Sequence, residues 1–195
     1  MQDIILASQS PRRKMLLEWA EVPFEVIVKH TDEDYPAGLT ISETAIHIAR
    51  SKALAVRSYV QNAFHGQYAG KTILAADTMV VLDDTAIGKP KDRDDAIHIL
   101  QSLSGRQHKV ITGVVILHSK GEMAFSDVTD VAFHPLSDEE IAFYVDKYEP
   151  YDKAGAYAIQ EWIGVVGIQS INGDFYNVMG LPVSRVVQAL HTIKL

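Results

Sequence analysis

Hydrophobic and polar positions change period along the first half of the chain, and these changes predict strands and helices in alternation. An apolar run at 4–7 is typical of a buried strand. The Ser10-Pro11 pair that follows predicts a helix start, because serine caps helices and proline suits their first position. Thr40 and Glu43 form a capping-box pattern ahead of apolar residues at helical spacing. The pattern also predicts strands at 24–28 and 71–82 and a helix at 92–103.

The second half contains four β-prone runs that flank turn signals. The runs at 109–118 and 123–133 are separated by a Ser-Lys-Gly turn, which predicts an antiparallel hairpin. The runs at 163–171 and 175–178 flank Asn172-Gly173, a dipeptide typical of hairpin turns. We therefore interpret these two runs as a second pair of strands.

Two helix signals complete the pattern and decide the fold class. The segment 137–140 caps one helix, and Pro182 starts a last amphipathic helix. Strand–helix units combined with hairpins predict an α/β fold with a mixed, curved sheet and flanking helices, and they disfavour an all-parallel sheet. The chain has no repeat, linker or low-complexity tract. We expect a single domain over residues 1–195, divided into two lobes around a cleft.

Composition and charge restrict the function classes. With 25 acidic and 18 basic residues the formal net charge is -7, which argues against a general nucleic-acid or anionic-membrane binder. The absence of cysteine excludes disulfides, thiolate metal sites and cysteine nucleophiles. The amino terminus lacks a signal-peptide pattern, and no apolar run approaches the length of roughly 18 residues that a membrane span needs. We expect a soluble, unprocessed chain, and a reducing cytoplasm fits it.

The segment from Ser8 to Arg13 carries the first candidate chemistry. Arg12 and Arg13 fall in the first turn of the predicted helix, where the partial positive charge of the helix terminus disfavours cations. An anionic ligand would offset this conflict. Backbone N–H groups, the hydroxyls of Ser8 and Ser10 and two guanidinium groups predict a phosphate cradle. The alternative is that both arginines reach solvent or pair with surface carboxylates.

Single charged residues in unusual places are further candidates. Asp77 interrupts the apolar strand at 73–81, so it needs a cation, a metal or hydrogen-bond donors nearby. It is our first candidate for a general base or metal ligand, and the alternative is an aspartate capped by its own backbone. Lys52 lies on or beside the buried face of the predicted second helix. Lys89, between Gly88 and Pro90, sits on a stiff turn that would aim its ammonium group.

The segment 149–160 runs from charged residues directly into small ones. Small residues let a backbone approach a ligand closely, and Gln160 offers an acceptor and two donors suited to a nucleobase edge. The alternative is a tightly packed helix with a charged cap. His108, at the start of a predicted strand, is interpreted as structural rather than catalytic.

Together these segments resemble the Maf family of nucleoside triphosphate pyrophosphatases over nearly the whole chain, from Leu6 to Pro182. The order and spacing of the short matches carry the resemblance. The matching stretches are 8–13, 76–78, 88–90, Ser104-Gly105 with His108, Thr112-Gly113, 149–157 and 180–182.

The resemblance implies a fold, an assembly and a reaction. The family fold has a deep cleft, is shared with inosine-triphosphate pyrophosphatases, and often forms homodimers. The family hydrolyses a nucleoside triphosphate to the monophosphate and pyrophosphate with a divalent cation, usually Mg²⁺ or Mn²⁺.

The resemblance also assigns roles to residues. Asp77 matches the proton acceptor, and Glu33 matches a further active-site carboxylate, although the neighbouring Asp32 is an open alternative. With the metal placed between the triphosphate and the carboxylates, Asp77 and Glu33 become its expected ligands. The phosphate-binding groups match Ser8, Arg13, Lys52 and Lys89.

The paired arginines and the ending of the 149–160 segment resemble the subgroup that acts on dTTP and UTP. In that subgroup, positions matching Arg12, Thr78 and Gln160 influence base choice. Pyrimidine nucleotides with modified bases are also candidate substrates. Two alternatives stay open: a house-cleaning pyrophosphatase for non-standard purine nucleotides, and a nucleotide-binding regulator of septum formation.

Overall fold

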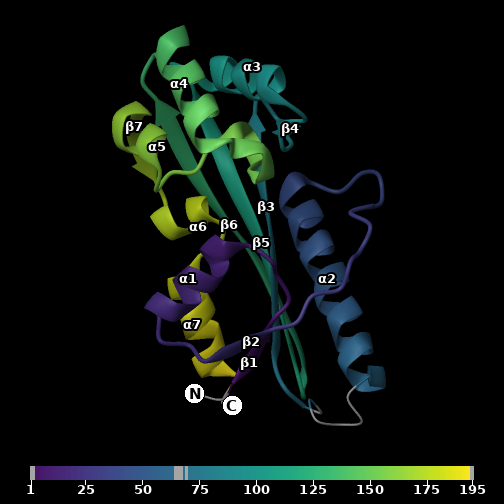
Figure 1. Cartoon of the computed structure of the whole chain (residues 1–195). Coiled ribbons are helices and arrows are strands. Elements are labelled where there is room, and N and C mark those ends of the chain that lie inside the picture. Colours follow the sequence, from purple (N-terminus) through teal and green to yellow (C-terminus); the bar gives the residue numbers. More distant parts are fainter. Residues whose placement is uncertain (1–2, 64–67, 69, 194–195) are drawn as a thin grey trace. The chain divides into compact units, whose positions relative to one another are not determined.

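The structure, a computed structural model, describes residues 3–63, 68 and 70–193 (Figure 1). The strands are β1 (Ile4–Leu6), β2 (Phe24–Val26), β3 (Ile73–Leu82), β4 (Thr85–Ile87), β5 (Gln107–His118), β6 (Gly121–Phe133) and β7 (Ile168–Asn172). The helices are α1 (Pro11–Trp19), α2 (Ile41–Ala63), α3 (Arg93–Leu103), α4 (Asp138–Tyr148), α5 (Trp162–Gly167), α6 (Phe175–Met179) and α7 (Val183–Thr192), with short 3-10 helices at Pro150–Asp152 and Ala154–Ala156.

The seven strands form one mixed sheet in the order β2-β1-β3-β5-β6-β7, with β4 paired to β3. Strand β1 pairs in parallel with β2 and β3, whereas β4 pairs with β3 and β7 pairs with β6 in antiparallel fashion. Strands β5 and β6 are sheet neighbours joined by two residues, a connection that only antiparallel strands allow. The predicted α/β fold with a mixed sheet and flanking helices is confirmed.

The chain divides into two compact units, each with its own buried core. The first unit comprises Met1–Asp77, Thr112–Asp127 and Gly180–Leu195, and the second comprises Thr78–Ile111 and Val128–Met179. Two units agree with the predicted division into lobes. The cleft and the single domain over 1–195 stay predictions, and the ends of that range lie outside the described residues.

The core of the first unit lies between the sheet and α2. Helix α2 runs along one face of the strands (Figure 1). It presents an apolar stripe at helical spacing to alternating residues in and just after β1, in β3 and in β5. At Gly113 of β5 the helix backbone lies too close for a side chain, because a Cβ there would stand 2.3 Å from the carbonyl carbon of Ala45. The stripe consists of Ala49, Ala53, Val56 and Val60, and it packs on Ile5, Ala7, Ile73, Ala75, Val115 and Leu117.

The core of the second unit contains a cluster of three rings. His108 stacks on Phe133 at 5.4 Å, and Tyr157 packs edge-on against both rings. His108 Nε2 and the Tyr157 hydroxyl share a hydrogen bond of 2.7 Å. Burial lowers the pKa of His108 from 6.5 to about 4 and raises that of Tyr157, so both are neutral at pH 7. This agrees with the structural interpretation of His108.

The buried His108 predicts that stability falls on acidification. Its pKa is lower in the folded chain, so the unfolded chain binds the extra proton first between about pH 6.5 and pH 4. The free energy of unfolding therefore keeps its full value above pH 6.5 as far as this group is concerned. It decreases below that pH, by about 2 kcal/mol between pH 7 and pH 5. Urea unfolding of the wild type and His108→Gln at both pH values measures it. His98→Gln, an exposed matched control, should keep the wild-type loss, and an unchanged loss in His108→Gln would contradict the prediction.

The predicted hairpin around Asn172-Gly173 is wrong. Residues 162–167 form α5, only 168–172 form a strand, and 175–179 form α6. Strand β7 pairs with β6 instead of with the next segment, in the register Asp130↔Asn172. Thr129 on β6 holds the turn, because Asp174 N donates to its hydroxyl at 3.1 Å and that hydroxyl donates to the Asp174 carbonyl at 3.0 Å. The Asp174 carboxylate then accepts from Tyr176 N at 2.7 Å and starts a helix.

No helix in the described part of the chain is both long enough and apolar enough to cross a membrane.

Candidate functional site

Lys52 joins two carboxylates in the first unit. Its Nζ donates to Asp77 Oδ1 at 2.6 Å and lies 2.8 Å from Glu33 Oε1. Helix α2 supplies the lysine, β3 supplies Asp77, and the segment after β2 supplies Glu33. The side chains of Lys52 and Asp77 are 22% and 15% exposed, while Glu33 is 56% exposed. The cation that Asp77 was expected to need is therefore Lys52, so capping by its own backbone is not required to explain Asp77.

The amino end of α1 has the predicted cap. Ser10 is the N-cap, its side chain accepts from Arg13 N at 3.5 Å, and Pro11 occupies the first turn. Arg13 folds inward: its Nε donates to the Gly180 carbonyl at 2.8 Å, and a terminal nitrogen donates to Ser8 Oγ at 3.0 Å. Both Arg13 and Ser8 are buried. The alternative that Arg13 reaches solvent or a surface carboxylate is wrong, whereas Arg12 is half-buried.

Arg13 is electrically coupled to the carboxylate pair. Burial lowers its pKa to about 10, and the charge of Asp77 opposes this shift, as does Glu33 to a smaller degree. The guanidinium therefore stays charged at pH 7. A buried cation, a lysine and two carboxylates thus lie within one electrostatic environment in the first unit.

The geometry distinguishes between the acids near 33. Glu33 contacts Lys52, and its charge acts on Arg13. Asp32 is exposed, and in the part of the chain that the structure describes its carboxylate makes no ion pair with Lys52. The contact with Lys52 favours Glu33 as the site carboxylate.

The remaining predicted residues, Thr78, Lys89 and Gln160, belong to the second unit. Lys89 is exposed just after β4, and the turn that carries it is fixed because Gly155 N donates to the Gly88 carbonyl at 3.1 Å. Gly155 has φ +72, and a Cβ there would meet Val80 Cγ2 at 2.9 Å. Two of the matching stretches, 88–90 and 149–157, therefore pack against each other. Thr78 is half-buried on β3.

Gln160 is exposed in a turn, and the residues around it are anchored. The Ala158 amide donates to the Tyr144 hydroxyl at 3.2 Å, and that hydroxyl donates to the Glu161 carboxylate. Lys153, which is buried, lies 3.6 Å from the same carboxylate. The alternative of a packed helix with a charged cap is wrong, because the segment forms two short 3-10 helices followed by a turn.

Sequence reasoning missed the partners that hold these groups. Gly180 belongs to a matching stretch but received no role, and it accepts the Arg13 hydrogen bond. Tyr144 and Glu161 were not considered. The available signals were a tyrosine on the apolar face of α4 and an acid directly after Gln160, and neither is specific.

Arg13→Lys is expected to lower the free energy of unfolding by about 1–3 kcal/mol, because one ammonium group cannot serve both Gly180 and Ser8 and a buried acceptor is left without its donor. Urea unfolding measures the change. Arg57→Lys, at an exposed position on α2, is the matched control and should change stability by no more than about 0.5 kcal/mol. Equal stability of both variants would contradict the structural role of Arg13.

Comparison with known proteins matches residues 3–193 to the family of Maf-like proteins. The chain belongs to the Maf family. A dTTP/UTP pyrophosphatase of Porphyromonas gingivalis is 50% identical over 189 residues, covering 96% of this chain and 92% of that protein. A Maf-family relative with the same name from Bacteroides thetaiotaomicron is 47% identical over 184 residues, covering 94% and 92%. Another, from Cytophaga hutchinsonii, is 46% identical over 188 residues, covering 96% and 83%.

Among solved structures, the Ham1 protein of Staphylococcus aureus aligns with this Maf-family chain at a TM-score of 0.47 and 17% identity, covering 100% of both chains.

Proposed function

We propose that this Maf-family protein hydrolyses dTTP and UTP to the nucleoside monophosphate and pyrophosphate. The observation that carries the proposal is Lys52 held between Asp77 and Glu33 in the electrostatic environment of buried Arg13. This arrangement combines a carboxylate that can accept a proton with cations that can bind phosphate. The names of relatives at 46–50% identity support the choice of substrates.

In the proposed reaction, Asp77 orients a water molecule and accepts its proton as the water attacks the α-phosphorus. The bond from that phosphorus to the oxygen bridging to the β-phosphorus breaks, and the oxygen leaves with pyrophosphate. Lys52 fixes the Asp77 carboxylate through Oδ1, so the second oxygen is the expected proton acceptor. Ser8, Arg13, Lys52 and Lys89 are the proposed phosphate-binding groups. Phosphoryl transfer depends mainly on such positioning and charge stabilisation.

A divalent cation, Mg²⁺ or Mn²⁺, is part of the proposal, with Asp77 and Glu33 as its ligands. Within the described residues no group of three or more His, Cys, Asp and Glu side chains could hold a metal ion. Two carboxylates still fit Mg²⁺, which proteins commonly bind through one or two carboxylates together with substrate phosphates. When bound, the ion would neutralise phosphate charge in the transition state.

Base selection is proposed for Arg12, Thr78 and Gln160. A glutamine amide can accept from N3–H of uracil or thymine and donate to a neighbouring carbonyl. The exposure of Gln160 and the anchoring of its turn through Tyr144 and Glu161 support this role. Pyrimidine nucleotides with modified bases share the same hydrogen-bonding edge and are included in the proposal.

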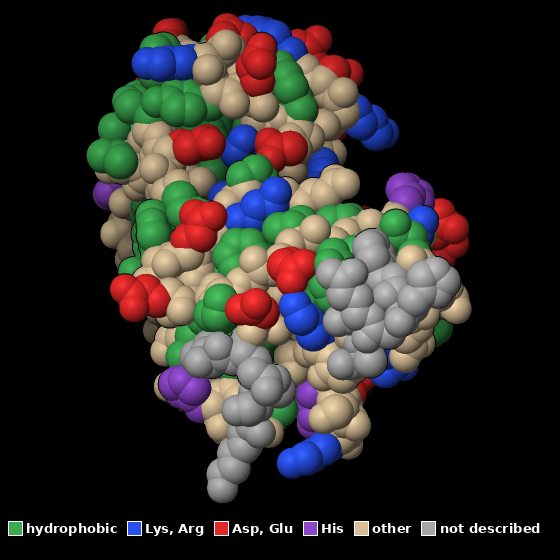
Figure 2. Space-filling model, turned by 60° about the horizontal axis from the view of Figure 1, so that its bottom comes forward, with side chains coloured by type: hydrophobic (Ala, Val, Ile, Leu, Met, Phe, Trp, Pro, Cys, Tyr) green, Lys and Arg blue, Asp and Glu red, His purple; other side chains and the backbone are tan. Residues whose placement is uncertain are grey.

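The ligand class, the assembly and the location are proposed from charge and family resemblance. The net charge is -7, and Figure 2 shows acidic side chains interspersed among the basic ones on the face that it draws. This supports a nucleotide rather than a nucleic acid as the ligand. A homodimer and a cytoplasmic location complete the proposal.

A substrate panel tests this function. Pyrophosphate and orthophosphate release would be measured with dTTP, UTP, CTP, purine and modified nucleotides, with Mg²⁺ or Mn²⁺. We expect pyrophosphate from dTTP and UTP. Purine preference would overturn the base assignment, and binding without turnover would overturn the enzymatic proposal.

Gln160→Glu is expected to lower kcat/KM for dTTP and UTP by about tenfold or more, because a carboxylate replaces the amide donor that faces a base carbonyl. The matched control is Gln169→Glu, at an exposed position of β7 in the same unit, and it should stay within about twofold of the parent. Equal kcat/KM values for the two variants would remove Gln160 from base recognition.

A further inference from the structure

The exposed Gln160 lies in a turn of the second unit whose two ends are held by one side chain. Residues 158–161 form this turn, since Glu161 N donates to the Ala158 carbonyl at 3.0 Å. Tyr144 of α4 is fully buried and contacts both ends of the turn. The Ala158 amide donates to its hydroxyl at 3.2 Å, and that hydroxyl donates to the Glu161 carboxylate. We call Tyr144 and Glu161 the clamp of the Gln160 turn.

The hydrogen bonds of the clamp run in one direction. A carboxylate only accepts hydrogen bonds, so the Tyr144 proton points to Glu161 and an oxygen lone pair is left for the Ala158 amide. Lys153, whose side chain is 10% exposed, lies 3.6 Å from the Glu161 carboxylate and compensates its charge. Removing the Tyr144 hydroxyl would therefore deprive both ends of the turn of this partner, in a place where an unpaired polar group is costly.

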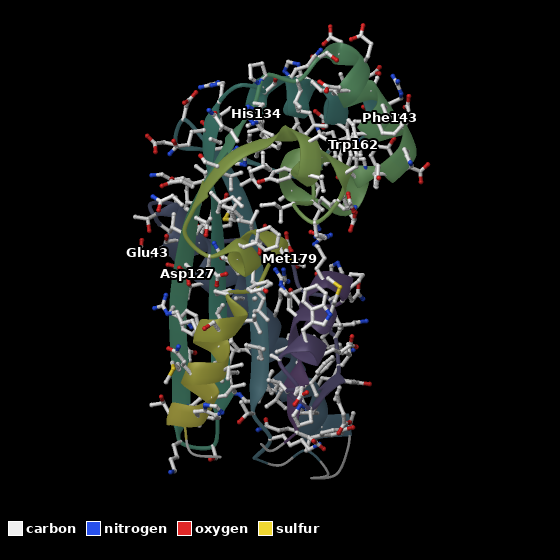
Figure 3. The ribbon with its side chains drawn as sticks, turned by 90° about the vertical axis from the view of Figure 1, so that its left-hand side faces the viewer. Glu43, Asp127, His134, Phe143, Trp162 and Met179 are labelled. Carbon is white, nitrogen blue, oxygen red and sulfur yellow. The ribbon has the colours of Figure 1, made fainter. Side chains whose placement is uncertain are left out.

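Packing of α4 and α5 holds the backbone around the turn as well. Phe143 of α4 packs edge-on against Trp162, the first residue of α5, with ring centroids 4.9 Å apart (Figure 3). Gly164 of α5 lies against the turn itself, because a Cβ there would overlap the Ile159 carbonyl oxygen. The backbone on both sides of Gln160 is therefore fixed.

The side chain of Gln160 is left for a ligand. It is exposed, and within the described part of the chain its amide group makes no hydrogen bond to another residue. When a ligand binds, only the side-chain torsions have to be ordered, because the backbone is already held. Such preorganisation lowers the entropic cost of binding. A fixed turn that carries a free amide is therefore suited to recognising the edge of a base.

We propose that Tyr144 and Glu161 are positioning residues for base recognition, which hold the Gln160 turn so that its amide meets the edge of uracil or thymine. This rests on the proposed role of Gln160 in base selection and adds the residues on which that role depends. The clamp contacts the turn and none of the proposed phosphate-binding groups. Its loss should therefore weaken binding of the base and leave binding of phosphate unchanged.

Isothermal titration calorimetry of the whole chain with Mg²⁺ separates these two parts of binding. The probes are α,β-methylene-UTP, which cannot release pyrophosphate, and tripolyphosphate, which lacks the nucleoside. Tyr144→Phe should weaken binding of α,β-methylene-UTP by about tenfold and change that of tripolyphosphate by no more than about twofold, because only the turn loses its hydrogen bonds. Tyr148→Phe is the matched control, since this ring stacks on Tyr144 with centroids 5.0 Å apart. It should leave both affinities within about twofold of the parent.

Glu161 supplies an independent pair of variants. Glu161→Ala removes the acceptor of the Tyr144 hydroxyl and should weaken binding of α,β-methylene-UTP by about tenfold. Glu161→Gln keeps an oxygen that can accept from the same hydroxyl and should stay within about threefold of the parent. Circular dichroism checks that each variant is folded, and this pair decides the question if Tyr144→Phe does not fold.

Equal losses of affinity for the two probes would overturn the positioning role, because they would show that the clamp only stabilises the fold. Unchanged affinities in Tyr144→Phe and Glu161→Ala would overturn it as well. Gln160→Glu, titrated alongside, separates this role from base selection itself. A loss for α,β-methylene-UTP in Gln160→Glu alone would overturn the clamp and leave the proposed role of Gln160 standing. A parent protein that binds α,β-methylene-ATP as tightly as α,β-methylene-UTP would overturn both.

Discussion

Asp77→Asn is expected to lower kcat for pyrophosphate release from dTTP by about 10²–10⁴-fold, the range typical of a lost general base. The amide keeps the size of the side chain and an oxygen that can accept from Lys52, but it cannot accept a proton from water. The ion pair with Lys52, 2.6 Å long, becomes a hydrogen bond from the charged ammonium group to a neutral amide oxygen, and Glu33 still contacts the same ammonium group. The fold should therefore survive while the chemical step is lost.

The control for Asp77→Asn is the same substitution at Asp127. Asp127 lies on β6 in the same unit and forms an ion pair of 3.8 Å with Arg185. Asp127→Asn should retain kcat within about twofold of the parent. Circular dichroism and urea unfolding would confirm that both variants are folded. If Asp77→Asn kept kcat within about threefold of the parent, Asp77 would not be the proton acceptor.

Gly113→Ala is expected to lower the free energy of unfolding by about 3 kcal/mol or more, or to prevent folding, because overpacking against backbone atoms cannot be relieved by a rotamer change. A Cβ at this position would lie 2.3 Å from Ala45 C, 2.4 Å from Ile46 N and 2.6 Å from Ala45 O. Helix α2 would have to move away from β5. Since α2 also carries Lys52, the same movement would disturb its contact with Asp77.

Gly88→Ala provides the comparison for Gly113→Ala. No atom lies within 4 Å of a Cβ built at Gly88, and its φ is not in the left-handed region. This substitution should change the free energy of unfolding by no more than about 1 kcal/mol in urea unfolding. A Gly113→Ala protein as stable as the Gly88→Ala protein would show that α2 and β5 are not in backbone contact.

Local signals explain which parts of the fold were predictable. The Thr40–Glu43 capping box forms as expected, with Thr40 N donating to the Glu43 carboxylate at 2.8 Å, and Ser137 caps α4 with Glu140 in the same way. Such caps depend on residues three apart, so sequence alone specifies them. The prediction of paired strands in 163–178 was wrong because apolar runs and an Asn-Gly dipeptide do not decide between strand and helix. Pairing of β7 with β6 and the contact with Thr129 decided it.

In the candidate site, too, some features were predictable from the sequence and others depended on the fold. A lone aspartate in an apolar strand predicts a cation nearby. Lys52, beside the buried face of α2, was a candidate for that cation, and in the structure it donates a hydrogen bond to Asp77. The acceptor for Arg13 was not predictable, because Gly180 lies 167 residues away in the chain. The selection of Glu33 over Asp32 also required the fold, since neighbouring acids in a polar segment look alike in sequence.

The most direct test of the proposed reaction is the fate of solvent oxygen during dTTP hydrolysis in ¹⁸O-enriched water. Attack on the α-phosphorus predicts one ¹⁸O atom per molecule of dTMP and unlabelled pyrophosphate, both measured by mass spectrometry. Label in pyrophosphate would show attack on the β-phosphorus. Label in released orthophosphate, with dTDP as the other product, would show attack on the γ-phosphorus. Either result would contradict the assignment of this protein as a pyrophosphatase that acts at the α-phosphorus.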